Sequence, residues 1–170
     1  LFEDCKRYGT LPFAGLARAA FIAVQLLDSL EATGVLEPDD KLRFLRSLNT
    51  VGSSLSTDFI ALDRAQFLLR YGHLRPGTYD IRSPRYDEDP DRYFCWALEP
   101  RNARKTKDSE RFSLSLEQLK KGRRLLDEHD LELDIIELFD FIKAAIEGRE
   151  DSQFVFSRSL SDVLSAVASL

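Results

Sequence analysis

The chain has 170 residues, of which 44% are apolar and 31% are charged. A chain of this length predicts one domain, and its composition excludes a disordered tail, a collagen-like rod and a low-complexity linker. The formal net charge of -5 argues against a nucleic-acid-binding module.

The N-terminal sequence has no signal-peptide layout, because charged residues interrupt it from position 3 onward. No run of about 18 residues is free of charge, so the sequence predicts no membrane span. Cys5 and Cys95 are too far apart for a redox or metal-binding pair, and unpaired thiols favour a reduced, cytoplasmic setting. The chain contains no Met and ends in an apolar periodic run. We therefore expect residues 1–170 to be a single helical domain cut from the centre of a longer multidomain protein, with a trimmed mature chain as the alternative.

The first predicted helix covers residues 11–33. Thr10 is placed to cap it, Pro12 lies in its first turn, and Gly34 is placed to end it. Apolar side chains surround almost the whole segment, which predicts a core helix buried on most sides. A helix that forms part of a site, or one that docks on a missing part of the protein, remains an alternative.

The following helix begins at Pro38 and keeps an apolar period to Leu62, with a break expected near residues 52–54. A shorter helix is predicted over residues 64–71, between the cap Asp63 and Gly72.

Two more helices are predicted in the C-terminal third. Ser115 and Gln118 have the spacing of a capping box, which predicts a helix that ends near His129. Asp134 caps a last helix whose apolar period continues to the chain end. No alternating run of strand type occurs, so the predicted class is an all-α helical bundle.

Residues 72–112 form one long irregular insertion in this bundle, because prolines, glycines and dense charge exclude a long helix there. Aromatic residues up to Trp96 indicate that the insertion is pinned to the helical body. Residues 101–111 offer few such anchors and are expected to be mobile. Their basic side chains also make a weaker candidate for polyanion binding, which salt would weaken.

The sequence lacks the common nucleotide-binding and hydrolase motifs and any clustered zinc ligands. Its one dense constellation lies within residues 71–86. Guanidinium groups bind phosphate or carboxylate in a planar, bidentate manner, and prolines and glycines would hold them in place. The alternative is a surface loop whose arginines pair with nearby carboxylates. The acids concerned are Asp80, Asp87, Glu88, Asp89 and Asp91.

Residues 2–27, 70–94 and 154–164 together resemble the central helical region of phosphoenolpyruvate-synthase-like proteins, which belong to the phosphoenolpyruvate-utilising phosphotransferases and include the rifampicin phosphotransferases. The middle motif of that group commonly reads H-R-G-P-G-E-x-D-x-x-x-P-R-W. The positions that match it here are His73, Pro76, Gly77, Asp80, Pro84 and Arg85. Leu74 and Arg75 replace the Arg-Gly pair, Thr78 replaces the acid, and Tyr86 replaces the tryptophan.

The resemblance implies a parent with an ATP-binding domain, which uses Mg, and a swivelling domain that carries a phosphorylated histidine. The helical region would bind the small-molecule acceptor and contact both domains. It would itself hold no cofactor and no metal, and neither nucleic acid nor membrane is an expected partner. The fragment alone is not expected to be catalytic.

The same resemblance suggests roles for seven residues. We expect the catalytic candidates His73 and Asp80 to accept the proton of the acceptor hydroxyl. Three arginines would face the transferring phosphoryl group or orient the swivelling domain, and two tyrosines would wall the acceptor pocket. These five are Arg75, Arg82, Arg85, Tyr79 and Tyr86. The alternative is a non-catalytic helical scaffold that links the nucleotide-binding and swivelling domains.

Overall fold

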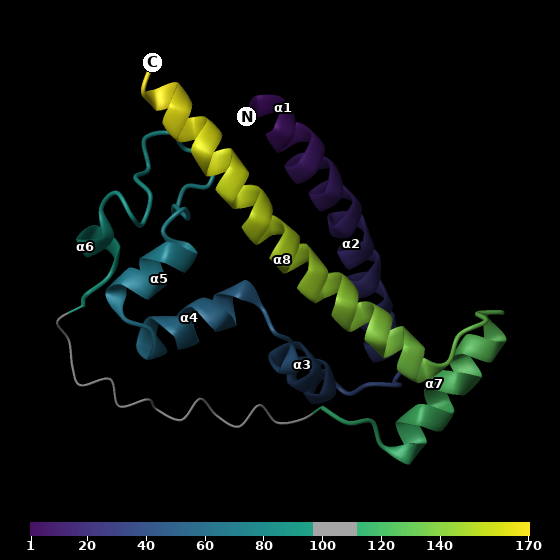
Figure 1. The fold of residues 1–170 in the computed structure, drawn as a ribbon. Helices are drawn as coiled ribbons and strands as arrows, with labels where there is room; N and C mark the ends of the chain where they lie inside the picture. Colours follow the sequence, from purple (N-terminus) through teal and green to yellow (C-terminus); the bar gives the residue numbers. More distant parts are fainter. Residues whose placement is uncertain (97–111) are drawn as a thin grey trace. The chain divides into compact units, whose positions relative to one another are not determined.

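The computed structural model describes residues 1–96 and 112–170, and every regular element within them is a helix, which confirms the all-α class (Figure 1). The elements are α1 (Phe2–Asp4), the π-helical turn η1 (Cys5–Thr10), α2 (Leu11–Ala32), α3 (Pro38–Ser47), α4 (Val51–Ala61), α5 (Arg64–Tyr71), α6 (Pro90–Tyr93), α7 (Leu116–Glu128) and α8 (Ile135–Ala168). Between α5 and residue 96 the chain is irregular apart from α6, as predicted. The stretch 101–111, expected to be mobile, lies outside the described residues.

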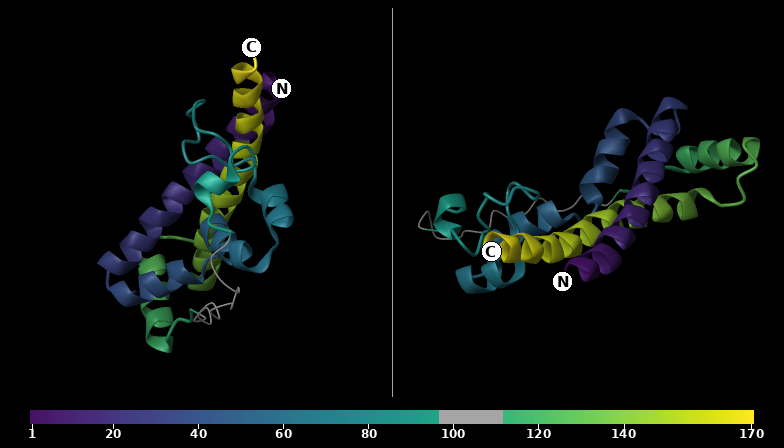
Figure 2. Two further views of the ribbon diagram at one scale, coloured as in Figure 1. Left: turned by 90° about the vertical axis from the view of Figure 1, so that its left-hand side faces the viewer. Right: turned by 90° about the horizontal axis from the view of Figure 1, so that it is seen from above.

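The described chain divides into two compact units. Unit 1 comprises residues 1–14, 50–96 and 150–170, and unit 2 comprises residues 15–49 and 112–149. Both α2 and α8 contribute residues to each unit, and α8 is one uninterrupted helix, as two further views show (Figure 2). The single-domain organisation stays a prediction.

The helix start predicted at Thr10 is wrong. The chain is helical from Phe2 to Ala32 and passes through η1 without a break. Pro12 lacks an N–H and its ring crowds the carbonyl four residues earlier, so it disturbs regular α-helical bonding. The wider π-helical turn directly before α2 accommodates that disturbance, which is why the proline does not mark a helix start. The predicted end is confirmed, because Gly34 adopts the left-handed conformation with φ +72°.

The prediction that this helix is buried on most sides is also wrong. Its buried residues in α2 are small or aliphatic and lie on one face: Ala20, Ala23, Leu27 and Leu30. Phe21 and Ile22 remain 66% and 56% exposed. By length and composition the helix from Phe2 to Ala32 could cross a membrane, although the sequence predicted no membrane span. Buried core helices of soluble proteins and N-terminal signal sequences meet the same criterion.

The break in the second predicted helix lies at residues 48–50 and not at 52–54. Thr50 accepts a hydrogen bond from the Ser53 backbone N–H at 3.2 Å, and the Ser53 hydroxyl in turn accepts from the Thr50 N–H. This capping box starts a new helix, α4, so Ser53 marks the start of a helix and not a break. The polar run that suggested a break therefore belongs to the first turn of α4.

The remaining predicted caps are confirmed. Asp63 accepts from the Gln66 N–H at 2.8 Å at the start of α5, and Ser115 and Gln118 form the capping box of α7. Asp134 accepts from the Glu137 N–H at 2.9 Å and α8 then runs to Ala168. Both cysteines are free thiols.

Candidate functional site

Short backbone hydrogen bonds fold residues 72–87 back on themselves. The Tyr86 N–H donates to the Leu74 carbonyl at 2.8 Å, and the Asp87 N–H donates to the Gly72 carbonyl at 3.1 Å. Gly72 is required at its position, because a Cβ there would lie 2.3 Å from the Leu68 carbonyl oxygen. The segment is therefore anchored at its base, directly after α5.

Arg75 is 7% exposed and joins the segment to α8. Its Nη1 donates to the Ser83 carbonyl at 3.1 Å, and its Nη2 donates at 3.1 Å to the hydroxyls of Ser161 and Ser165. Those serines lie one helical turn apart on α8, so they share a face. The buried charge is thus held by neutral oxygens, and its Nε has no partner among the described residues.

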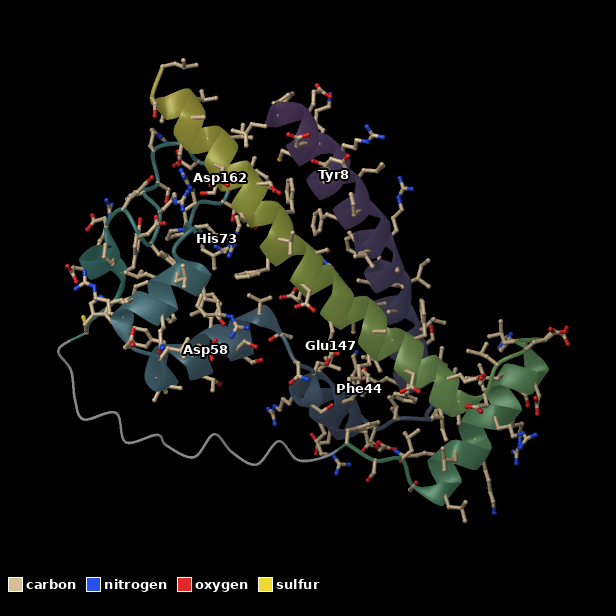
Figure 3. The ribbon with its side chains drawn as sticks, in the orientation of Figure 1. Tyr8, Phe44, Asp58, His73, Glu147 and Asp162 are labelled. Atoms are coloured by element: carbon tan, nitrogen blue, oxygen red, sulfur yellow. The ribbon has the colours of Figure 1, made fainter. Side chains whose placement is uncertain are left out.

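His73 lies beside the same part of α8, 5% exposed, with its ring 4.8 Å from the ring of Phe154 in an edge-to-face arrangement (Figure 3). The imidazole donates to the Phe154 backbone carbonyl, and Nε2 has no hydrogen-bond partner within the described chain. Burial, together with the positive charges of Arg158 and Arg85, lowers the pKa of His73, although Asp162 opposes this. His73 is therefore a neutral, buried imidazole at pH 7.

Arg85 bridges the segment to α8 through carboxylates. It donates to the two carboxylate oxygens of Asp87 at 2.8 and 2.7 Å and to Asp162 of α8 at 3.1 Å. The Asp87 carboxylate, with smaller help from Asp162, raises the pKa of Arg85. A bidentate contact of this kind fixes the guanidinium plane, so Arg85 positions the segment and is not free to bind a ligand.

The tip of the segment carries the accessible candidates. Tyr79 is 72% exposed, and the Arg82 side chain is 87% exposed while pairing with Asp80 at 3.1 Å. The hydrogen bond from Arg82 lowers the pKa of Asp80. A carboxylate stabilised in this way is a weaker proton acceptor, which weighs against a general-base role.

Tyr86 belongs to an aromatic cluster of unit 1. Its ring lies 4.8 Å from Phe94 and 5.2 Å from Tyr93, and the Tyr93 hydroxyl donates to the Pro84 carbonyl at 3.1 Å. Burial raises the pKa of Tyr86, and Tyr93 adds to the effect. Tyr86 therefore stabilises the fold of the segment through its packing in the aromatic cluster.

The seven candidates thus form two groups. His73 and Arg75, which are buried, and Arg85 and Tyr86, which are half-buried, make the buried base. The exposed Tyr79 and Arg82 make the exposed tip together with the half-buried Asp80. Sequence reasoning missed the partners on α8, namely Ser161, Asp162 and Ser165. The spacing of the two serines by four residues was the available signal, but only the structure shows which side chains they meet.

No protein-family model, curated protein or solved structure matches this chain. Within the part of the chain that the structure describes, no group of three or more His, Cys, Asp or Glu residues is arranged to hold a metal ion.

The lowered pKa of His73 predicts a loss of stability in acid. The unfolded chain takes up a proton at its ordinary pKa of about 6.5, before the folded chain does. The free energy of unfolding therefore falls as pH drops through about 6.5, by at most about 1.4 kcal/mol per pH unit for one proton. We expect His73→Gln to flatten this slope between about pH 6.5 and 5, measured by urea unfolding.

The matched control is His129→Gln, which changes the other histidine of the chain, an exposed residue in unit 2. The change in slope should be larger in His73→Gln than in this control. An unaltered slope in His73→Gln would contradict the buried, neutral state of His73.

Proposed function

We propose that this chain is the acceptor-side helical domain of a phosphoenolpyruvate-synthase-like phosphotransferase. It would position a small-molecule acceptor for phosphoryl transfer from a phosphohistidine on another domain, with ATP and Mg acting elsewhere in the parent. This proposal starts from the resemblance of residues 70–94 and 154–164 to that group.

One observation carries the proposal: the chemistry-bearing residues of the two resembling segments touch each other. Arg75 contacts Ser161, Arg85 contacts Asp162, and His73 contacts Phe154. These contacts span more than 70 positions of sequence, as in the 77 positions between Arg85 and Asp162. Two motifs that must be brought together to hold charged groups in place are typical of a built site.

The exposure of the candidate residues suggests which of them bind the phosphoryl group and which hold the segment in place. Phosphoryl transfer needs charge neutralisation and positioning, and an exposed guanidinium supplies both. Arg82 is the accessible arginine of the three, and its pair with Asp80 is an exposed one that an incoming phosphate can displace, since exposed ion pairs stabilise little. Arg75, Arg85 and His73 act as positioning residues, and Tyr79 offers a ring beside the ligand.

The test is a titration of the chain with inorganic phosphate and with phosphoenolpyruvate, followed by NMR amide shifts of residues 79–82. We expect saturable shifts in both titrations, and Arg82→Ala should weaken binding by about three- to tenfold. Arg124→Ala, which removes an exposed arginine of α7, is the control and should bind both ligands as tightly as the unaltered chain does. Equal loss in both variants, or no saturable shift, would overturn the assignment of the phosphate to Arg82.

In the full-length parent, His73→Ala and Arg85→Ala test the segment as a whole. Both changes should lower turnover because they loosen the tip that faces the acceptor. Unchanged turnover in both variants would remove the catalytic role of residues 72–86.

A second function, that of a helical scaffold linking the two other domains, is favoured by the exposed apolar side chains of the N-terminal helix. Leu11, Phe21 and Ile22 are 71%, 66% and 56% exposed. Thermal-shift measurements with phosphate, pyruvate, phosphoenolpyruvate and hydroxylated acceptors distinguish the two functions. Binding raises the melting temperature by mass action, whereas a flat response to every ligand favours the scaffold.

A further inference from the structure

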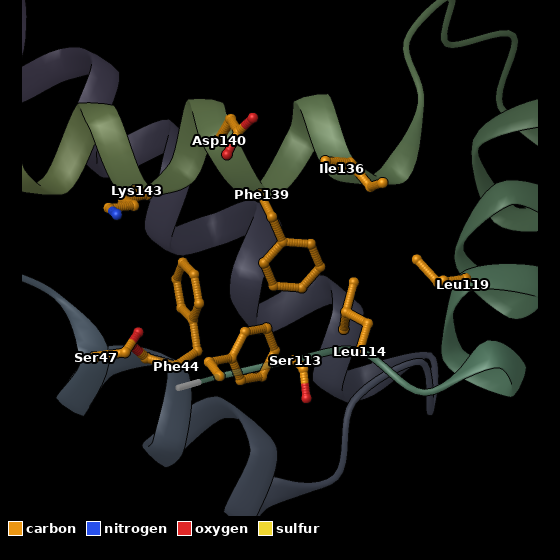
Figure 4. A pocket seen from close by; sticks show the side chains of 10 residues that line it. Phe44, Ser47, Ser113, Leu114, Leu119, Ile136, Phe139, Asp140 and Lys143 are labelled. Atoms are coloured by element: carbon orange, nitrogen blue, oxygen red, sulfur yellow. The ribbon is translucent and has the colours of Figure 1, made fainter. Parts of the chain in front are cut away.

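A pocket with a volume of about 360 Å³ opens in unit 2, between α3, residues 112–114, α7 and α8 (Figure 4). It shares no residue with the segment 72–96. Its volume lies at the lower end of the range of small-molecule sites, which suits a ligand with one ring or a short branched chain. This pocket was not foreseen from the sequence, in which Phe44 belongs to the apolar period of the helix predicted from Pro38.

Three phenylalanine rings form one wall of the pocket. The Phe44 ring centre lies 5.1 Å from that of Phe112 and 5.2 Å from that of Phe139, both in edge-to-face arrangements. Phe44 and Phe139 point toward each other from α3 and α8 and are 4% and 7% exposed, so their neighbours hold them in place. A preformed aromatic wall of this kind binds an apolar group without a large ordering cost.

The rim of the pocket carries one positive and one negative side chain. Asp140 and Lys143 are exposed, lie about one turn apart on α8, and both line the pocket. Opposite charges at this spacing commonly pair along a helix. Here no ion pair joins them to each other or to another residue of the described chain. The rim therefore carries one anion-binding and one cation-binding group on the same helix, and both line the pocket.

We propose that this pocket binds a free α-amino acid with an aromatic or branched apolar side chain. The ligand carboxylate would meet the Lys143 ammonium, the ligand ammonium would meet the Asp140 carboxylate, and the side chain would lie against the phenylalanine wall. A ligand that carried only a carboxylate would pair with Lys143 but be repelled by Asp140. A ligand that carried only an ammonium would pair with Asp140 but be repelled by Lys143. The zwitterion matches both charges. This inference does not depend on the proposed function.

The test compares three probes of similar size by calorimetry and by NMR amide shifts of residues around the pocket. L-Phenylalanine carries both charges, 3-phenylpropanoate lacks the ammonium, and phenethylamine lacks the carboxylate. We expect L-phenylalanine to bind about tenfold more tightly than either analogue. Equal affinity of 3-phenylpropanoate would overturn the proposal in favour of a site for monoanions. Failure of all three probes to give saturable binding at millimolar concentration would overturn it altogether.

Two rim variants complete the test. Lys143→Met and Asp140→Asn should each weaken L-phenylalanine binding by roughly five- to tenfold. In Lys143→Met, L-phenylalanine should bind no more tightly than phenethylamine, which lacks the carboxylate. In Asp140→Asn, it should bind no more tightly than 3-phenylpropanoate, which lacks the ammonium. Both positions are exposed, so the fold should persist. The controls, Lys120→Met and Asp127→Asn, make the same chemical changes on α7 outside the pocket lining. Losses of equal size in rim and control variants would contradict the site.

Discussion

Replacing Arg75 by alanine is expected to lower the free energy of unfolding of unit 1 by about 3 kcal/mol. The change removes hydrogen bonds to Ser83, Ser161 and Ser165 and the packing of a side chain that is 7% exposed. It also leaves the Ser83 carbonyl without its donor, which is costly inside a protein. Residues 72–87 should lose protection against amide hydrogen exchange first, because Arg75 ties them to α8.

A second substitution separates packing from charge. Arg75→Met keeps most of the aliphatic stem and removes a buried cation that only neutral oxygens hold, so part of the desolvation penalty is recovered. We therefore expect Arg75→Met to cost only about 1 kcal/mol. Arg82→Ala, which breaks an exposed local pair in the same segment, should leave the free energy of unfolding nearly unchanged.

Urea unfolding followed by tryptophan fluorescence measures these effects in the right unit, because Trp96 is the single tryptophan of the chain and lies in unit 1. If Arg75→Ala cost no more than Arg82→Ala, the buried guanidinium would not be what anchors the segment.

Local sequence signals predicted most of the helices, because their causes lie within a few residues. Asp63, Ser115 and Asp134 each cap a helix through hydrogen bonds to a backbone N–H three residues later. Such short-range bonds form wherever the sequence places them. The errors arose where two local signals competed. Pro12 and Thr10 favour a helix start, but the π-helical turn absorbs the proline within a longer helix.

The arrangement of the candidate site was only partly predictable. Composition and spacing singled out residues 71–86, but they could not show that Arg75 and His73 face inward while Arg82 and Tyr79 face solvent. That division follows from contacts with α8, such as the 3.1 Å bond from Arg85 to Asp162, which joins residues far apart in the chain. The unit 2 pocket was missed for the same reason, since Phe44, Phe112 and Phe139 meet only in the folded chain.

The two groups of candidates also imply different mutational signatures. Changes at the buried base should act on stability and on binding together, because His73 and Arg75 hold the segment in place. Changes at the exposed tip should act on binding alone, since among the described residues Arg82 pairs with its neighbour Asp80 alone. A variant of Arg82 that lost stability as strongly as one of Arg75 would contradict this division.

Phe67→Ala is expected to produce a still larger loss, about 4 kcal/mol of unfolding free energy in unit 1. Phe67 is 0% exposed and lies at the centre of an aromatic cluster. Its ring centre is 5.0 Å from that of Tyr71, 5.1 Å from that of Phe94 and 5.7 Å from that of Trp96. Truncation would remove contacts to these three rings and to the ring of Phe59, and would leave a cavity that rigid aromatic neighbours fill poorly.

The consequence extends to the candidate site, because α5 carries Phe67 and leads directly into the segment that begins at Gly72. Leu69→Ala is the matched control: it truncates another apolar residue of α5, but one that is 84% exposed, and should cost about 0.5 kcal/mol or less. Urea unfolding by Trp96 fluorescence compares the two variants, and the Phe67→Ala chain should also release residues 72–87 to faster hydrogen exchange. Similar losses for the two variants would mean that helix propensity in α5, and not the aromatic cluster, holds the segment in place.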